Sequence, residues 1–303
     1  MTDSPFPAPG STDIALSVRT HDRVGERRTD ASWLAETWAD PRTRIVPVAG
    51  TEFPVDEAGE SVRWHAASDL RVDGLRIFLG ERDGVSYFAI EVGAPTDEGR
   101  WTGFRAVVQS LPEPDAGFMV HAIALAEWHA THRFCPRDGS RLVASDAGHV
   151  MRCEEHGHQQ FPRTDPAVIM LVTDGEDRAL MGRQAAWPEG RFSTLAGFVD
   201  PGESLEEAVI REVLEESGVH AQGVTYFGNQ PWPFPQSLMV GFFARATSTD
   251  IHVDGAELSD ARWFSREEMK AEADAGTLVL PGGISISRSL VEAWYGGPLP
   301  GSW

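Results

Sequence analysis

Residues 211–218, REVLEESG, place Glu212, Glu215 and Glu216 close together on one predicted helix. Glutamates three and four residues apart share a helix face and repel each other by about 0.2–0.5 kcal/mol per pair. Such a helix is either a solvated surface helix or a platform for cations. Mg²⁺ and Mn²⁺ prefer oxygen ligands and keep waters that bridge to phosphates. Bound to these carboxylates, they would orient and activate water for attack on a diphosphate.

The helix that carries the glutamates has clear predicted ends. Ser204 with Glu207 forms a capping box at its start, and Gly218 is a natural terminator. Between these ends, an apolar arc at helical spacing is formed by Val209, Ile210, Val213 and Leu214. The pattern predicts a helix that is buried on one side and acidic on another. We expect Arg211 to pair with Glu203 or Glu215 and to fix the helix against the loop at Gly197.

The longer string GFVDPGESLEEAVIREVLEESGV, residues 197–219, fills the pattern G-x5-E-x7-R-E-U-x-E-E-x-G-U, where U is aliphatic. It resembles the Nudix box with every defined position occupied, which favours the cation platform over a solvated helix. The resemblance implies Mg²⁺ or Mn²⁺ ligands from the Ala196 carbonyl, Glu212, Glu215, Glu216 and the later acid Glu257. It also implies that Glu216, with Glu215 beside it, is catalytic, and we expect Glu216 to activate water.

A second motif, QPWPFPQS at residues 230–237, combines three prolines with two aromatic residues. This composition excludes an ordinary helix or central strand and predicts a rigid loop whose rings can stack on a planar base. It resembles the SQPWPFPxS signature of the NADH pyrophosphatase branch of Nudix hydrolases, with Asn229 in place of the first serine. The resemblance implies substrate contacts at Arg105, Phe161, Phe198, Gln230, Trp232, Phe234, Gln236, Ser237 and Ser287.

This resemblance covers roughly residues 100–297 and implies an activity. Members of that branch cleave NADH or NAD⁺ to nicotinamide mononucleotide and AMP, and remove 5′ NAD caps from RNA. They act as homodimers with a shared active site. Two alternatives remain open: a Nudix pyrophosphatase for ADP-ribose or another nucleoside diphosphate derivative, and a non-catalytic nucleotide-sensing Nudix module. The motif QPWPFPQS argues against the first, and the complete set of box glutamates argues against the second.

The family also has a short zinc ribbon with four cysteines before the Nudix domain. Here the spacing is Cys135-x2-Asp138-x14-Cys153-x2-His156, so two cysteines are replaced. Zinc accepts Cys, His and carboxylate ligands, and one structural Zn²⁺ per chain is chemically possible. His158 or His149 could compete for the fourth position. The alternative is a ribbon that holds together by packing without metal.

Strands alternate with helices around these motifs. We expect two strands in 75–92 joined at Asp83-Gly84, a buried helix over 116–134, and strands at AVIMLVTD, RALMGRQ, GVTYFGN and SLMVGFFARAT. SREEMKAEADAG and SISRSLVEAW read as closing helices. The fold class expected is α+β: a Nudix α/β/α sandwich with a mixed sheet after a small N-terminal α+β domain. The expected segments are a flexible tail (1–30), an N-terminal domain (31–130), a zinc-ribbon-like segment (131–163) and a Nudix domain (164–303).

Bulk properties limit the remaining possibilities. The chain has 303 residues and a net charge of −20, which argues against nucleic-acid binding through a broad basic face. Two cysteines cannot build a disulfide framework. The N-terminal residues lack signal-peptide features, and no apolar run reaches the length of a membrane span. We therefore expect a cytoplasmic protein without membrane contact.

Overall fold

The computed structural model describes residues 14–96, 99–253 and 255–300, which fall into two compact units. The first unit contains residues 14–17, 165–232 and 237–300, and the second contains residues 18–164 and 233–236. Each unit is described by itself below. Of the predicted tail (1–30), residues 1–13 lie outside the described residues, whereas in residues 14–30 Ile14 is buried in a core and Asp22 forms a bridge with Glu81.

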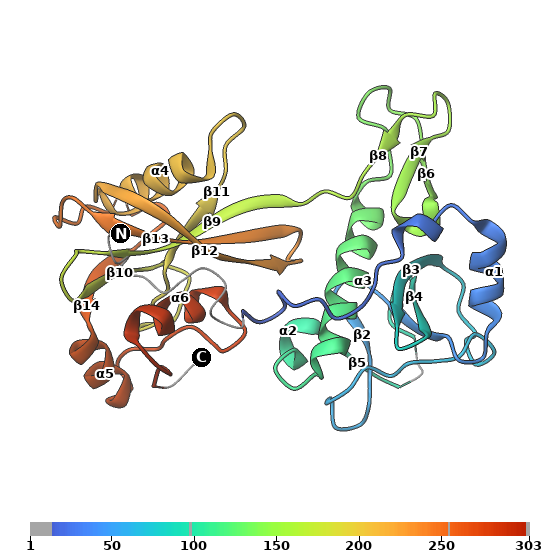
Figure 1. Cartoon of the computed structure of the whole chain (residues 1–303), viewed down its shortest axis with the longest axis horizontal. Coiled ribbons are helices and arrows are strands. Elements are labelled where there is room, and N and C mark those ends of the chain that lie inside the picture. Colours follow the sequence, from blue (N-terminus) through green and yellow to red (C-terminus); the bar gives the residue numbers. More distant parts are fainter. Residues whose placement is uncertain (1–13, 97–98, 254, 301–303) are drawn as a thin grey trace. The chain divides into compact units, whose positions relative to one another are not determined.

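The first unit is built on a six-stranded sheet (Figure 1). Its strands are β9 (Asp165–Thr173), β10 (Arg178–Arg183), β11 (Leu195–Phe198), β12 (Ala221–Trp232), β13 (Ser237–Ala246) and β14 (Asp260–Ser265). Their order is β12-β13-β9-β10-β14, with β11 paired to β9. Since β13 runs parallel to β9 while the other pairs are antiparallel, the sheet is mixed.

The central strand β9 faces a hydrophobic core on each side. Val168, Met170 and Val172 point into the core beneath helix α4 (Leu205–Ser217), while Ile169 and Leu171 point into the core beneath α6 (Ile286–Tyr295). The alternation follows the two-residue period of a strand, so a continuous apolar run serves both faces. Helices therefore cover both faces of the sheet, with α5 (Arg266–Asp274) following β14 (Figure 1). The predicted α/β/α sandwich with a mixed sheet is confirmed.

The structure changes the interpretation of the proline-rich motif. Its first residues, Gln230, Pro231 and Trp232, end strand β12, and Trp232 pairs with Ser237 at the start of β13. Residues 233–236 form the turn between these strands. The loop prediction is wrong for the two ends of the motif. An edge strand tolerates proline because its outer backbone needs no ladder hydrogen bond, and β12 is the edge of its sheet.

The second unit contains the N-terminal elements. These are η1 (Gly25–Arg27), α1 (Ala31–Ala39), β1 (Arg44–Val48), β2 (Glu52–Val55), β3 (Leu75–Arg82), β4 (Val85–Glu91), β5 (Arg100–Gly103), α2 (Phe104–Val107) and α3 (Glu113–Thr131). The predicted hairpin at Asp83-Gly84 is confirmed: both residues have positive φ, 52° and 73°, as a tight two-residue hairpin turn requires. The prediction of a buried helix over 116–134 is confirmed by α3, whose middle is buried throughout.

A small three-stranded ribbon follows α3 in the same unit. It consists of β6 (Leu142–Ser145), the single turn η2 (Asp146–Gly148), β7 (Val150–Cys153) and β8 (Gln159–Gln160). Both cysteines are buried and reduced. Of the helices that the structure describes, none combines the length and apolar character needed to cross a membrane.

Candidate functional site

Arg211 is the centre of the acidic site on α4. Its Nη1 donates to Glu212 Oε1 at 2.7 Å and to Glu215 Oε2 at 2.9 Å. Its Nε and Nη2 donate to the two oxygens of Glu203 at 3.1 and 2.5 Å, and Nη2 also reaches the Phe198 carbonyl at 2.8 Å. The predicted pairing is confirmed with both expected partners, and Glu212 joins them. Arg211 thereby ties the helix to the loop that precedes it.

These contacts set the ionisation of the groups involved. The Arg211 guanidinium holds the pKa of the Glu203 carboxyl below its usual value, and three carboxylates raise the pKa of Arg211. Burial raises the pKa of Glu212, against the opposite effect of Arg211. Glu215 and Glu257 raise it further by charge repulsion, so the side chain of Glu257 lies close enough to belong to the same acidic field.

Two of the three box glutamates are almost fully buried: Glu212 is 6% exposed and Glu216 is 5% exposed. The Ala196 backbone N–H donates to Glu216 Oε2 at 3.3 Å. The carboxyl group of Glu212 lies over Gly197, where an added Cβ would sit 1.9 Å from Glu212 Cδ. The first glycine of the box is therefore required because a buried carboxylate occupies the space that any side chain would need.

This donor set fits a hard divalent cation. Buried carboxylates are normally paired or coordinate metals, and Mg²⁺ and Mn²⁺ take oxygen ligands of this kind. Among the described residues, no three of the box carboxylates bring their oxygens within 4.8 Å of one another, and Arg211 binds Glu212 and Glu215. A cation bound here would share Glu212 with Arg211, and Glu216 would approach from the Ala196 side.

A small pocket of about 160 Å³ lies beside Glu216 within the first unit. Its other walls include Gln184, Trp187, Thr194 and Leu258. No motif in the sequence predicted a role for the stretch from Gln184 to Thr194, which joins β10 to β11. Only its position before the box could have indicated that this stretch lies at the site. Its composition could not, because a tryptophan between small and polar residues is common in surface loops.

The predicted substrate residues of the first unit differ in accessibility. Phe198 is 58% exposed beside the acidic site, and Trp232 is half-buried at the end of β12. Gln230 is 1% exposed, and its amide bonds the backbone of Ala15, Ile284 and Ile286. Ser287 is equally buried, and its hydroxyl bonds Ser193 and Thr194. In this structure the hydrogen bonds of Gln230 and Ser287 therefore stabilise the strand and loop next to the site, and both side chains are buried.

Further predicted contacts belong to the second unit. The Arg105 guanidinium carbon lies 4.2 Å from the centre of the Phe234 ring, and Phe234 also stacks on Phe104 at 5.9 Å. Gln236 lies in the same turn as Phe234. Phe161 is 64% exposed just after β8. The signature turn thus places Phe234 against the predicted arginine, a contact that the sequence spacing did not reveal.

The ribbon forms a second cluster of metal-ligating groups. Cys135, Asp138, Cys153 and His158 bring one ligand atom each to within 4.8 Å of the others. His158 Nδ1 lies 3.6 Å from Cys135 Sγ and 3.4 Å from Asp138 Oδ2. Two buried cysteine sulfurs, a carboxylate and an imidazole make a donor set that zinc accepts.

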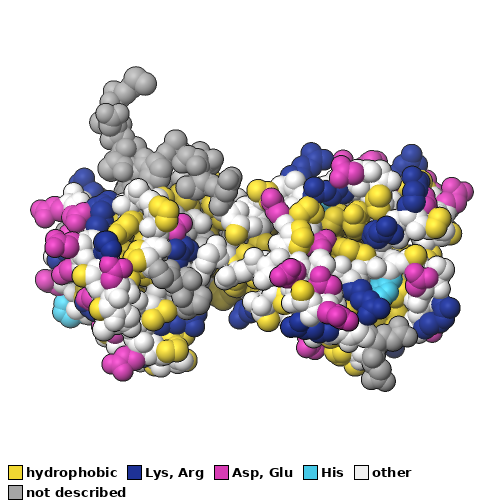
Figure 2. Space-filling view, turned by 90° about the horizontal axis from the view of Figure 1, so that it is seen from below, with side chains coloured by type: hydrophobic (Ala, Val, Ile, Leu, Met, Phe, Trp, Pro, Cys, Tyr) yellow, Lys and Arg dark blue, Asp and Glu magenta, His cyan; other side chains and the backbone are white. Residues whose placement is uncertain are grey.

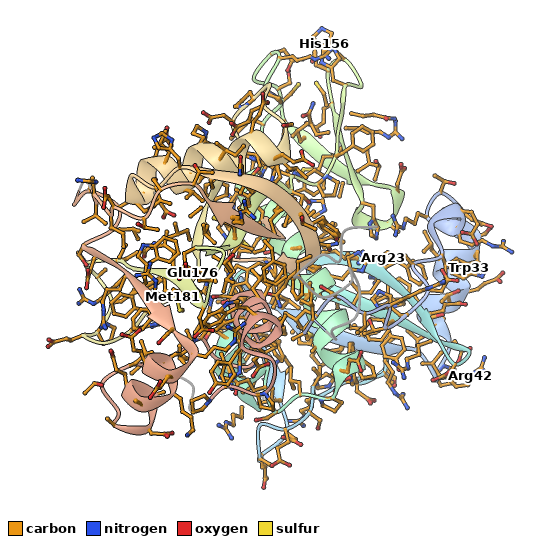
Figure 3. All side chains as sticks on the ribbon, turned by 60° about the vertical axis from the view of Figure 1, so that its left-hand side comes forward. Arg23, Trp33, Arg42, His156, Glu176 and Met181 are labelled. Atoms are coloured by element: carbon orange, nitrogen blue, oxygen red, sulfur yellow. The ribbon has the colours of Figure 1, made fainter. Side chains whose placement is uncertain are left out.

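His156, the fourth ligand expected from spacing, is not in this cluster. Its Nδ1 contacts Asp138 Oδ2 at 2.9 Å, and Figure 3 shows His156 at the outer end of the ribbon. His158, two residues later, brings its Nδ1 into the cluster instead. His149, the other candidate, instead donates a hydrogen bond from its Nε2 to the Phe78 carbonyl at 2.7 Å.

The chain carries a net charge of −20. Figure 2 shows basic and acidic side chains interspersed over the face that it presents. Since screening limits charge effects to about 8 Å at physiological salt, local groups decide what each site attracts. In the acidic site, the positive charge of Arg211 partly offsets the negative charges of the glutamates that it binds.

Three family models match successive parts of this chain. Residues 42–128 match the NADH pyrophosphatase-like rudimentary NUDIX domain, and residues 130–161 match the NADH pyrophosphatase zinc ribbon domain. Residues 163–279 match the NUDIX domain, which includes the acidic site described above. The matches follow one another along the chain in the order in which the structure places its N-terminal elements, ribbon and sandwich.

Similar proteins support the same grouping. A Mycobacterium bovis protein named NAD-capped RNA hydrolase NudC is 37% identical over 291 residues, which are 90% of this chain and 92% of that protein. A Macaca fascicularis protein named NAD-capped RNA hydrolase NUDT12 is 41% identical over 197 residues, which are 61% of this chain and 42% of that protein. With this identity over nearly the full length of the bacterial relative, the chain belongs to the NudC-like NADH pyrophosphatase family of Nudix hydrolases.

Proposed function

We propose that this protein hydrolyses the diphosphate of NADH and NAD⁺ to nicotinamide mononucleotide and AMP, and removes NAD caps from RNA. The observation that carries the proposal is the complete Nudix box, in which Arg211 holds three glutamates beside the Gly197 loop. The signature hairpin at residues 230–237 and the names of the NudC and NUDT12 relatives support this choice of substrate.

The reaction adds water across one phosphoanhydride bond. Mg²⁺ or Mn²⁺, when bound, offsets the phosphate charge and lowers the pKa of the attacking water. Glu216 accepts the proton of that water, since its carboxylate is buried and held at the Ala196 backbone. Glu212 and Glu257 add further negative charge to the site, and the ion pairs of Arg211 keep Glu212 and Glu215 in place. The P–O bond to the leaving nucleotide then breaks, and that nucleotide leaves as a phosphate monoester.

Exposed aromatic rings supply the binding surface for a dinucleotide. Phe198 and Phe161 are each more than half exposed, so their rings are accessible for stacking on a planar group of the substrate. We assign Phe198 and Trp232 to stacking on the substrate, with Phe161 and Arg105 as further contacts. Gln230 and Ser287 act by bracing the strand and loop behind the site, rather than by contact.

The decisive experiment is chromatographic product analysis with NADH, NAD⁺, ADP-ribose and a 5′-NAD RNA, each with Mn²⁺. We expect nicotinamide mononucleotide with AMP from the free dinucleotides, and a 5′-monophosphate end from the RNA. Glu216→Gln should abolish turnover while Mn²⁺ still binds. Cleavage of ADP-ribose with NADH untouched would overturn the substrate assignment, and binding without turnover on any substrate would overturn the enzymatic role.

Three finer features belong to the same proposal. One Zn²⁺ per chain would be held by Cys135, Asp138, Cys153 and His158, because these are the ligand atoms that converge. A homodimer is proposed because the resemblance to the NADH pyrophosphatase branch implies one. We also propose a cytoplasmic location, where NAD and RNA are both present. Light scattering after size-exclusion chromatography tests the dimer, and a mass of about 33 kDa would exclude it.

A further inference from the structure

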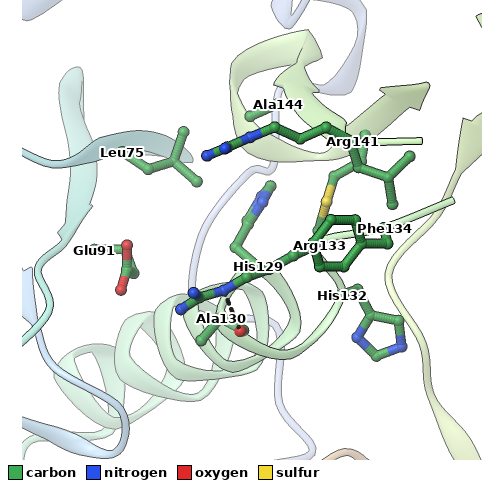
Figure 4. A pocket seen from close by; sticks show the side chains of 11 residues that line it. Leu75, Glu91, His129, Ala130, His132, Arg133, Phe134, Arg141 and Ala144 are labelled. Carbon is green, nitrogen blue, oxygen red and sulfur yellow. Dashed lines mark hydrogen bonds between the residues drawn. The ribbon is translucent and has the colours of Figure 1, made fainter. Parts of the chain in front are cut away.

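A second cavity lies in the other unit, and no residue of the Nudix box lines it. It has a volume of about 420 Å³, within the usual range for small-molecule sites. Its walls come from β3, β4, the end of α3 and the ribbon (Figure 4). Met151 and Leu142 are buried and form an apolar base, while charged side chains occupy the rim.

Two arginines project toward this cavity without carboxylate partners. Arg133 donates its Nε to the Ala130 carbonyl at 3.1 Å and makes no ion pair with any described residue (Figure 4). Arg141 forms neither a side-chain hydrogen bond nor an ion pair within the described ranges, and it projects to the same side as Arg133 in Figure 4. Guanidinium groups with free N–H donors are suited to bidentate binding of a phosphate.

Glu91 lies across the cavity from these arginines (Figure 4). Burial raises the pKa of its carboxyl, although the charge of Arg133 acts in the opposite direction. Within the described part of the chain its carboxylate has no hydrogen-bond or ion-pair partner. A half-buried carboxylate of this kind is stabilised by a ligand that donates hydrogen bonds, such as a hydroxyl or an amino group.

The cavity also has an aromatic platform. Phe134 is 66% exposed, the largest exposed fraction among the large hydrophobic side chains of the described residues. Phe134 is the residue after Arg133, and it lines the cavity together with His132. Exposed rings beside arginines bind the flat faces of nucleobases, since every base can stack on them. The cavity therefore offers hydrogen-bond donors for a phosphate, one carboxylate that accepts hydrogen bonds, and an aromatic ring for stacking.

We propose that this cavity binds a nucleoside monophosphate, with its phosphate on Arg133 and Arg141, a hydroxyl or amino group on Glu91, and its base against Phe134. The nucleotide is either free or one residue of an RNA strand, since both present the same groups. None of the proposed hydrolytic residues lines this cavity, so we expect it to bind the nucleotide without cleaving it. It goes beyond the proposed hydrolysis and does not depend on it.

Photo-crosslinking to the full-length protein tests the proposal. One arm uses 8-azido-AMP, and the other uses a 5′-monophosphorylated oligoribonucleotide containing 4-thiouridine, with the labelled peptides mapped by mass spectrometry. We expect label within residues 129–144, displaced by unlabelled AMP or oligonucleotide respectively. Label from 8-azido-AMP assigns a free nucleotide, and label from the oligonucleotide alone assigns an RNA strand.

Matched variants separate this site from general charge effects. Arg133→Gln and Arg141→Gln should each reduce the label in residues 129–144 at least about tenfold, because each removes a charge-assisted phosphate contact. Arg137→Gln changes the same net charge on the exposed ribbon outside the cavity and should leave the label unchanged. Melting curves confirm that each variant is folded. Label confined to the Nudix unit, or equal losses in all three variants, would overturn the proposal.

Discussion

Gly197→Ala tests how the box controls the position of its carboxylates. The alanine Cβ would lie 1.9 Å from Glu212 Cδ and 2.1 Å from each carboxylate oxygen, whereas ordinary contacts begin near 3.4 Å. Glu212 must therefore move by about 1.5 Å, the difference between 3.4 and 1.9 Å. A misplacement of about 1 Å in a catalytic group can cost about 100-fold in rate. We expect kcat for NADH to fall by about 100-fold or more, with weaker Mn²⁺ binding.

The fold should tolerate this change. Gly197 has an ordinary strand conformation, so alanine causes no backbone strain. Losing the 2.7 Å bond between Arg211 and Glu212 would cost about 1.5–3 kcal/mol, the range for a charge-assisted hydrogen bond. Gly283→Ala is the matched control, because an added Cβ there meets nothing within 4 Å. Product chromatography measures turnover, and calorimetry measures Mn²⁺ affinity.

One result would refute this reasoning. If Gly197→Ala were folded and kept the turnover and Mn²⁺ affinity of Gly283→Ala, the placement of Glu212 could not be what the reaction requires. A variant that loses Mn²⁺ binding but recovers turnover at high Mn²⁺ would instead locate the effect in metal affinity. That result would agree with Glu212 as a metal ligand rather than a base.

Three further predictions concern the rest of the chain. His158→Ala should lose zinc while His156→Ala keeps it, because only His158 brings its Nδ1 into the cluster; metal analysis and the spectrum of the Co²⁺-substituted protein check this, and equal zinc in both variants would contradict it. Ile14→Ala should destabilise the Nudix unit by about 2–5 kcal/mol, because Ile14 is only 7% exposed and packs in the core of that unit. Val18→Ala changes an exposed position and should have little effect. Urea unfolding measures both variants. Burial lowers the pKa of His149 to about 4, so the unfolded chain binds more protons between pH 4 and 6.5, and the stability present above pH 6.5 is lost as the pH falls. The difference between a pKa of 6.5 and one of about 4 corresponds to a loss of up to about 3 kcal/mol at low pH. His149→Gln should remove this contribution from unfolding curves measured from pH 7 to pH 4, and an unchanged slope would contradict the assignment.

The order of elements in the Nudix unit could be predicted from the sequence because its signals are local. A continuous apolar run marks β9, and Ser204 with Glu207 marks the start of α4 through the capping box that the structure contains. Strand β11 was missed because four residues carry too little periodicity, and β14 was missed because DARWFS is neither a continuous apolar run nor a clean alternation. In the N-terminal region only the hairpin at Asp83-Gly84 and the helix α3 had recognisable signals.

The sequence by itself determined the chemistry: the spacing of the box glutamates and Arg211 on one helix follows from helical geometry. Only the tertiary structure decided how these groups are held. Gly197 makes room for Glu212, Ala196 donates to Glu216, and His158 takes the place expected for His156. These contacts join residues that are distant along the chain or separated by a turn. Their distances depend on how strands and helices pack, which residue spacing alone does not encode.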